Sequence, residues 1–245
     1  MIVGHNNALG TGKITSRGAQ IRAASAGLVL ANAVDVDGGG FRFGGSNSLE
    51  FSGNFKNLPG GARTYANYTT GFKLTLNGNV DLNGLDLVFD GASSSTEVKG
   101  VISGTGNVSV AAAYTAGTVT LSGSNTYVGN TTINAGTAIF SGSNTYTGTT
   151  TIVAGTLVIG KDNALPTSSA LTLGSGTTVG TLDLSNFSQQ VAAFNVSSNS
   201  TSVNNIVIGN GKTFTTTGNV TVGVNTAAGT STRLTVAGAG AWNVN

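Results

Sequence analysis

Two consecutive 19-residue segments of this chain have almost the same sequence. Residues 122–140 read SGSNTYVGNTTINAGTAIF and residues 141–159 read SGSNTYTGTTTIVAGTLVI, and 13 of the 19 aligned positions are identical. Self-similarity at a short fixed period is the signature of repeat folds, in which each unit stacks on its neighbours. The chain is therefore predicted to be a stack of similar units.

Short segments with alternating polar and apolar residues run along most of the chain. They are residues 73–76, 118–121, 156–159, 170–173, 205–208, 219–222 and 233–236. Alternation that is rich in Thr and Val and bounded by Gly or Asn predicts half-buried β-strands. No segment of ten or more residues has helical spacing, so we predict an all-β fold with almost no helix.

A unit of 19 residues has room for two or three such strands, which is the length of one rung of a parallel β-solenoid. Each rung then pairs with the rungs before and after it, and equivalent side chains form ladders. At roughly 20 residues per rung, the chain of 245 residues predicts roughly a dozen rungs with uncapped ends. The pairs expected to stack are Tyr127 with Tyr146, Ile133 with Ile152, and Gly136 with Gly155.

The composition agrees with a solenoid and excludes several other classes. Gly, Thr, Asn and Ser make up half of the chain, yet 39% of the residues are hydrophobic, which is too many for a disordered chain. Gly and Asn supply the positive φ of tight corners, and Thr suits the outer face of a strand. There is no Cys, so disulfides and zinc–thiolate sites are excluded.

The charges are few and unevenly divided. Lys and Arg number 11 and Asp and Glu number 9, and residues 1–100 hold 15 of these 20. They do not form the basic patch of a nucleic-acid binder, so we expect no nucleic-acid partner. No apolar run is long enough to cross a bilayer. We treat residues 1–245 as a single solenoid, with a more charged part (1–100) and a nearly uncharged scaffold (101–245).

The tandem units resemble the autotransporter-associated β-strand repeat of bacterial type V secretion passengers. That family's approximate pattern is G-x-N-T-Y-T-G-x-T-T-I-x-x-G-T-L-x-V, and Gly142 to Val158 follows it closely. Gly123 to Ile139 follows it with Val128 and Ala138 as departures. The resemblance implies a right-handed parallel β-helix, displayed on the cell surface or secreted, whose repeats assist folding during secretion. It also implies a C-terminal translocator barrel in a longer protein, of which this chain is expected to be one segment.

Residues with catalytic or metal-binding chemistry are scarce. The single histidine, His5, lies at an expected exposed corner, so we predict no histidine-based catalysis and no metal site. Asp35 and Asp37 share one strand face at a spacing that would suit acid catalysis or weak Ca²⁺ binding, but solvated outer-face acids are the preferred interpretation. Asp81 and Asp183 occupy matching places in repeated phrases and are expected to bond local amides at corners. We predict no enzyme activity and no cofactor.

Residues 55–72 (FKNLPGGARTYANYTTGF) break the repeating pattern and are predicted to be a loop that leaves the solenoid. Loops on a rigid scaffold often carry binding residues, and Arg and Tyr are favoured contact types. We therefore take Arg63, Tyr65 and Tyr68 as candidate ligand contacts. The alternative interpretation is that the segment only covers an apolar edge.

The sequence thus predicts a structural stalk or adhesin scaffold of an exported bacterial surface protein. Its expected partners are glycans or proteins of a host or the environment, or neighbouring copies of the chain. Two alternatives stay open: a β-helix that binds or degrades polysaccharide, and a subunit of a self-assembling surface sheath or filament.

Overall fold

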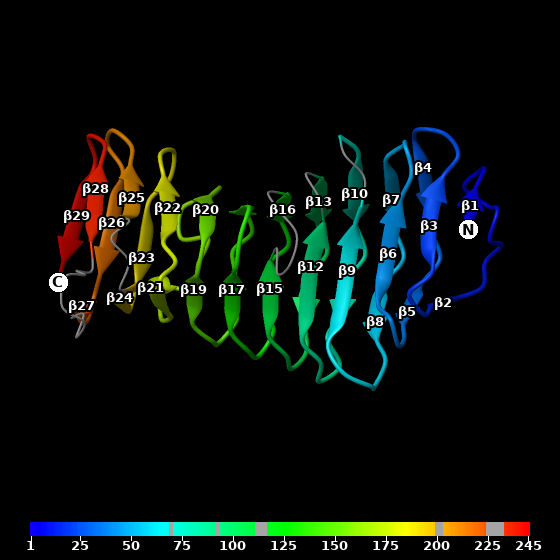
Figure 1. Ribbon diagram of the computed structural model, residues 1–245, viewed down its shortest axis with the longest axis horizontal. Helices are drawn as coiled ribbons and strands as arrows, with labels where there is room; N and C mark the ends of the chain where they lie inside the picture. The colour runs from blue at the N-terminus through cyan, green and yellow to red at the C-terminus, as the bar shows by residue number, and fades with distance from the viewer. Residues whose placement is uncertain (69–70, 92–93, 111–116, 199–202, 224–232) are drawn as a thin grey trace.

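The protein is an elongated coil of short strands, with its two termini at opposite ends of the long axis (Figure 1). The computed structural model describes residues 1–68, 71–91, 94–110, 117–198, 203–223 and 233–245. In these residues the regular structure is entirely β, and no helix is present. The predicted fold class, an all-β parallel solenoid, is confirmed.

Four parallel sheets run along the coil. Sheet 1 contains β1 (Ile2–Val3), β3 (Gln20–Ala23), β6 (Phe41–Gly44), β9 (Arg63–Asn67), β12 (Leu87–Gly91), β15 (Val108–Val110), β17 (Thr131–Ile133), β19 (Thr150–Ile152), β21 (Ala170–Gly176), β24 (Ala193–Ser198) and β27 (Val220–Val222). Sheet 2 contains β4 (Leu28–Leu30), β7 (Leu49–Phe51), β10 (Lys73–Leu76), β13 (Ser95–Val98), β16 (Thr118–Leu121), β18 (Thr137–Phe140), β20 (Gly155–Ile159), β22 (Gly180–Leu184), β25 (Asn204–Ile208) and β28 (Leu234–Ala237). Sheet 3 contains β2 (Ile14–Ser16), β5 (Val34–Val36), β8 (Phe55–Asn57), β11 (Val80–Asp81) and β14 (Ile102–Ser103), and sheet 4 contains β23 (Gln189–Val191), β26 (Thr213–Thr216) and β29 (Ala241–Val244).

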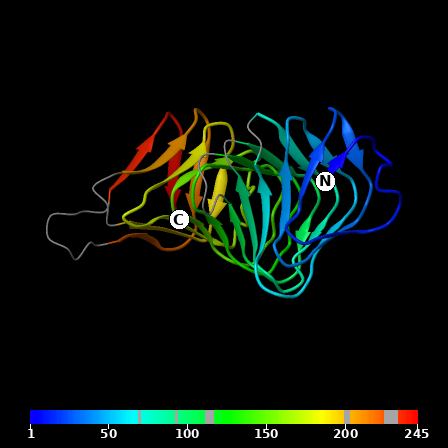
Figure 2. The ribbon, with the colours of Figure 1, turned by 45° about the vertical axis from the view of Figure 1, so that its right-hand side comes forward.

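The order of the strands shows how the chain winds. Strands β3, β6 and β9 run upward on the near side in Figure 1 while successive rungs move from right to left, which makes the coil right-handed. This is the hand that parallel crossover connections almost always take. Turned by 45°, the rungs appear as flattened coils set side by side (Figure 2). Sheet 1 has eleven strands within the described residues, slightly fewer than the dozen rungs expected.

The number of strands in a rung changes along the coil. Each of the rungs that begin with β3, β6, β9 and β12 has three strands, one for each of sheets 1, 2 and 3. The rungs of the tandem repeats, β17–β18 and β19–β20, have only two. Their third side is formed by the Ser-Asn-Thr-Tyr segments, which continue the stack as irregular chain. The predicted 19-residue unit is therefore a rung in which one strand is replaced by a corner.

Inward-facing side chains fill the inside of the coil. Along many of the strands, such as β12, β16 and β22, buried and partly exposed residues alternate, as the sequence pattern predicts. In the first part of the coil the core is aromatic. Phe41, Phe51 and Phe55 meet edge to face with ring centroids 5.3 or 5.4 Å apart. Such contacts add about 0.5–1.5 kcal/mol per pair to the burial of the rings.

A column of glycines marks the corner after sheet 2. It consists of Gly53, Gly78, Gly100, Gly123 and Gly142 on successive rungs. At each of them an added Cβ would lie closer than 3.0 Å to the carbonyl group of the corner residue one rung earlier. The backbones of neighbouring rungs approach so closely here that no side chain fits, which explains why the chain needs so much glycine.

The two ends of the coil differ. Near the N-terminus, a turn at residues 5–10 places Leu9 against the core. In the last rung, Val222, Val236 and Val244 are 45%, 45% and 61% exposed, although they are in register with core positions of the preceding rung.

Residues 55–72 are part of the solenoid and not a loop that leaves it, with residues 69–70 outside the described part. Within this segment, β8 pairs with β5 and β11, and β9 pairs with β6 and β12, all in parallel register. Residues 58–62 connect β8 to β9, and of the other described residues in this segment 68, 71 and 72 lie outside the strands. The misleading signals were Pro59 and the basic and aromatic residues, which the sequence pattern alone could not place inside a rung.

Candidate functional site

The interface between the two tandem repeats is built from identical residues stacked on one another. Tyr127 and Tyr146 lie parallel, with ring centroids 4.8 Å apart and an angle of 7° between the ring planes. The spacing equals the distance between neighbouring strands, so the rings form a ladder rung by rung. Both tyrosines are buried, with 0% and 1% exposure. The predicted tyrosine ladder is present.

Each stacked tyrosine is also held by a hydroxyl of its own unit. The hydroxyl of Tyr127 is hydrogen-bonded to Thr131, and that of Tyr146 to Thr150 at 2.5 Å. These threonines face inward and are buried, with exposures of 0% and 1%. The tyrosine and the threonine four residues later are therefore one structural element, repeated in both units.

The other predicted pairs stack as well. Ile133 and Ile152 are directly opposed in the pairing of β17 with β19. Gly136 and Gly155 both have positive φ, 68° and 80°, and a Cβ on Gly155 would collide with the main chain of Gly136. The corner therefore requires glycine in both units.

Two buried asparagines, Asn125 and Asn144, form a second ladder that was not singled out from the sequence. The Oδ1 atom of Asn125 accepts a hydrogen bond from the amide of Ile102 at 2.8 Å. The Oδ1 atom of Asn144 accepts from the main-chain amide of Asn125 at 3.0 Å and from its Nδ2 at 2.8 Å, and Asn144 Nδ2 donates to the carbonyl of Ala164 at 2.7 Å. Here side chains replace the missing strand of the two-stranded rungs. Identity of Asn in both units was the available signal.

Burial controls the ionisation of the tyrosines in the core. It raises the pKa of Tyr146 to about 12, against the hydrogen bonds of Thr150 and Thr131, which lower it. Burial also raises the pKa of Tyr127, and the neighbouring Tyr146 adds to the effect. The same cause places the pKa of Tyr65 well above 10.0. These hydroxyls stay protonated at neutral pH and act as hydrogen-bonding core groups.

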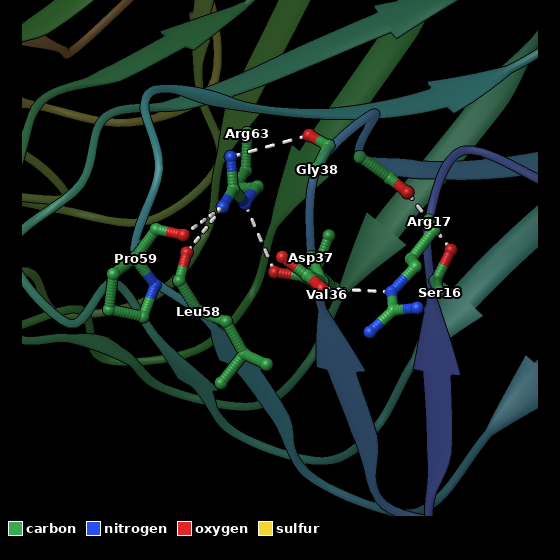
Figure 3. Close-up of polar contacts among 9 residues, drawn as sticks. Ser16, Arg17, Val36, Asp37, Gly38, Leu58, Pro59 and Arg63 are labelled. Atoms are coloured by element: carbon green, nitrogen blue, oxygen red, sulfur yellow. Dashed lines mark hydrogen bonds and ion pairs between the residues drawn. The ribbon is translucent and has the colours of Figure 1, made fainter.

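Arg63 lies inside the solenoid, at 1% exposure, and not on its surface. Its Nε donates to the carbonyl of Val36 at 3.0 Å, and Nη1 donates to the carbonyls of Gly38 at 3.3 Å and Gly61 at 2.9 Å. Nη2 donates to the carbonyl of Pro59 at 3.0 Å and to that of Leu58. Figure 3 shows the guanidinium between the corner that carries Gly38 and the turn at Leu58 and Pro59. As placed, the side chain cannot meet an external ligand.

The two tyrosines of the same segment differ in their surroundings. Tyr65 is 1% exposed, donates its hydroxyl to Asn57 Oδ1 at 2.9 Å and meets Phe89 edge to face at 6.0 Å. Tyr68 is 41% exposed. Of the three candidate ligand contacts, the structure places Tyr68 alone at the surface.

The acidic residues considered in the sequence are held by neighbouring groups. Asp35 pairs with Lys13 at 2.8 Å and Asp37 with Arg17 at 3.0 Å, each between neighbouring rungs. The Arg17–Asp37 pair lies beside the Arg63 corner in Figure 3. Such exposed pairs contribute about 0–1 kcal/mol each.

The two corner aspartates bond local amides as predicted. Asp81 Oδ1 accepts from the amide of Asn83 at 2.9 Å, and Asp183 Oδ1 accepts from the amide of Ser185 at 2.8 Å. In both cases the acceptor lies two residues before the donor, which is the geometry of an Asx turn. Their matching places in the repeated phrases therefore reflect matching corners.

His5 is exposed and begins the N-terminal turn, where its carbonyl accepts from the amide of Ala8 at 3.0 Å. In the described ranges, no three His, Cys, Asp or Glu side chains gather closely enough to hold a metal ion. These ranges also contain no helix that is long and apolar enough to span a bilayer.

The fold and this interface define a class: a parallel β-solenoid built on stacked repeats. Within that class, residues 116–137 and 135–159 match the model of the passenger-associated-transport-repeat family. The tandem units are therefore repeats of the autotransporter passenger type, and the resemblance noted in the sequence is confirmed. No curated protein and no solved structure matches the chain significantly.

Proposed function

We propose that this chain is a rigid stalk segment of an exported bacterial surface protein, and that its tandem repeats serve as a template on which the following rungs fold during secretion. The repeat match and the solenoid support a passenger-like structural scaffold. Export to the cell surface and the templating role are the further steps of the proposal.

The observation that carries the proposal is the ladder between the two units. A folded unit presents the face of Tyr127 and the amide of Asn125, and the next unit supplies Tyr146 and the Oδ1 of Asn144 to meet them. Each unit thus buries its polar groups only when its neighbour is in place. Nearest-neighbour stabilisation of this kind makes repeat proteins fold by propagation from one unit to the next.

The proposal is tested by displaying the full-length gene product on the surface of a bacterial host that has an outer membrane. The variant Asn125→Ala/Asn144→Ala removes the asparagine ladder from both units. Surface exposure is measured on intact cells by antibody binding and by cleavage with added protease. We expect less displayed protein and more protease-sensitive protein, because the tandem rungs fold too slowly to act as a template.

The matched control is Thr126→Ala/Thr145→Ala. These threonines directly follow the two asparagines, and both side chains are exposed. We expect wild-type display from this control. Equal display of the asparagine variant and the control would contradict the templating role, and absence of any displayed wild-type chain would contradict export.

One surface feature favours glycan contact as a second candidate function. A recess of about 260 Å³ lies over β4, β7 and β10, and Val29, Glu50 and Lys73 are among the residues that line it. Glu50 accepts a hydrogen bond from Asn77. Glycoside hydrolysis requires a pair of carboxyl groups about 5–9.5 Å apart, and Glu50 is the one carboxylate in this lining.

The single carboxylate of the recess therefore favours binding over cleavage, and the exposed Tyr68 is a separate candidate contact. Glycan-array binding by the wild type, lost in Glu50→Gln or in Tyr68→Ala, would support this second function. Release of reducing sugar from a polysaccharide panel would instead show a degrading enzyme. An array without any bound glycan would leave the stalk as the better description.

A further inference from the structure

The guanidinium of Arg63 is a buried cation held entirely by main-chain oxygens. All five hydrogen bonds that it donates within the described residues go to carbonyl groups. Five is also the number of N–H donors on a guanidinium, and they lie in one plane. The number of carbonyl acceptors therefore equals the number of N–H donors on the Arg63 side chain.

The five carbonyls come from two successive corners of the coil. Those of Val36 and Gly38 belong to the corner after β5, and those of Leu58, Pro59 and Gly61 belong to the turn after β8. Of these five residues, only Val36 lies in a strand, as the last residue of β5. Without the guanidinium, the carbonyls of four of these residues would lose the donor that they have here, whereas that of Val36 would keep the amide of Leu58 at 2.9 Å; the four are Gly38, Leu58, Pro59 and Gly61.

Arg63 itself belongs to the next strand, so the contact joins three consecutive levels of the chain. It opens β9, and its main-chain amide donates to the carbonyl of Asp86 at 2.8 Å on the following rung. Gly60 and Gly61 have φ of 126° and 103°, so the turn takes a backbone conformation that ordinary residues avoid. This backbone conformation accompanies the contacts of the turn's carbonyls with the guanidinium.

We propose that this corner is a guanidinium-binding site whose ligand is the chain's own Arg63, and that occupation of the site closes the turn at residues 58–62 onto the corner at residues 37–40. The ligand class is a planar cation with donors directed in its plane. An alkylammonium group, such as that of lysine or methylammonium, has three donors that do not lie in one plane, so it cannot pair with five carbonyls. Arg63 is a positioning residue in this role.

The experiment is chemical rescue. Arg63→Ala empties the site, and free guanidinium or methylguanidinium at millimolar concentration is then added to the purified chain. The readout is the rate at which a protease cleaves the turn at residues 58–62, together with the midpoint of urea unfolding. We expect cleavage to be at least roughly tenfold faster in the variant and to slow again with guanidinium.

Two controls separate site binding from general salt effects. Sodium chloride and methylammonium chloride at the same concentration are expected to leave the cleavage rate of Arg63→Ala unchanged. Arg42→Ala, a change at an exposed position on the outer face of β6, should cleave like the wild type and should not respond to guanidinium. Rescue by all three salts, or by none, would overturn the proposal.

Arg63→Lys keeps the inference testable if the alanine variant does not fold. Lysine retains the charge and most of the apolar stem but can donate to at most three of the five carbonyls. We expect a lower unfolding midpoint and faster cleavage of the turn than in the wild type. A lysine variant that equals the wild type in both measurements would show that a buried charge alone is sufficient, and would refute a site for guanidinium.

Discussion

The asparagine ladder allows a sharp prediction for the single change Asn144→Ala. The substitution removes the acceptor of the Asn125 amide and of Asn125 Nδ2, and it removes the donor to the carbonyl of Ala164. Asn125 and Ala164 are 1% and 0% exposed, so water does not replace the lost partners in the folded state. Each buried polar group without a partner destabilises by about 1–3 kcal/mol, which gives a loss of about 3–9 kcal/mol for the three groups.

A loss of this size is a large part of the 5–15 kcal/mol by which folded domains are usually stable. Repeat proteins can unfold in parts, so the best assay follows one position and not the whole chain. Amide hydrogen exchange of Asn125, together with urea unfolding, provides that. We expect faster exchange at Asn125 and a lower urea midpoint, whereas Thr145→Ala, at the exposed neighbouring position, should leave both unchanged.

The double variant Asn125→Ala/Asn144→Ala tests whether the two side chains act together. Because Asn125 loses its partner once Asn144 is gone, the second substitution should destabilise less than it does alone. Additive effects of the two substitutions would refute the ladder as a coupled unit. So would an Asn144→Ala variant with the exchange rate and midpoint of Thr145→Ala.

Three further perturbations follow from the structure. Gly123→Ala places a Cβ against the main chain of the preceding corner and should lower the urea midpoint strongly. The control Gly12→Ala, whose Cβ would meet nothing within 4 Å, should leave the midpoint unchanged. Equal midpoints would contradict the close approach of the rungs. The raised pKa of Tyr146 contributes stability that is complete below pH 10.0 and is lost as the pH rises through about 12. The free energy of unfolding of Tyr146→Phe should therefore fall less between these pH values than that of the wild type. An equal fall in both would contradict this. Partial burial raises the pKa of Glu97, but hydrogen bonds and charges led by Lys73 lower it below 4.5. The free energy of unfolding of Glu97→Gln should therefore fall less on acidification than that of the wild type. An equal fall in both would show that the Lys73–Glu97 pair does not affect stability.

The sequence predicted the repeat interface well because its two units have the same length. With an offset of 19, identical residues fall on identical residues, and the pairing of Thr131 with Thr150 and of Ile133 with Ile152 in the structure follows that offset. The alternation of polar and apolar residues likewise placed the strands of sheet 2, such as β10 and β16, at the residues that the structure shows. Where the repeat length is constant and polar and apolar residues alternate regularly, the sequence predicts which residues stack on one another.

The Arg63 corner could not be read in the same way because the rungs of the first part differ in length. Arg63 pairs with Leu87, 24 residues later, and Leu87 pairs with Val108, 21 residues later. Without a constant offset the sequence does not show that Arg63 occupies the position of a buried leucine in the next rung. Its pairing with carbonyls depends on the shape of a neighbouring corner, which no local pattern encodes.

The equal length of the two tandem units has a consequence for how such a rod can change its size. Because both units present the same tyrosine, asparagine and glycine faces, removing residues 141–159 would let the first unit meet the following rung through nearly the same surface, and inserting another copy would create no new type of contact. The distance between whatever lies on either side of the repeats is thus adjustable in steps of one strand spacing, about 4.8 Å. The tandem pair works as a length module, in which the reach of the rod can vary while its cross-section stays constant.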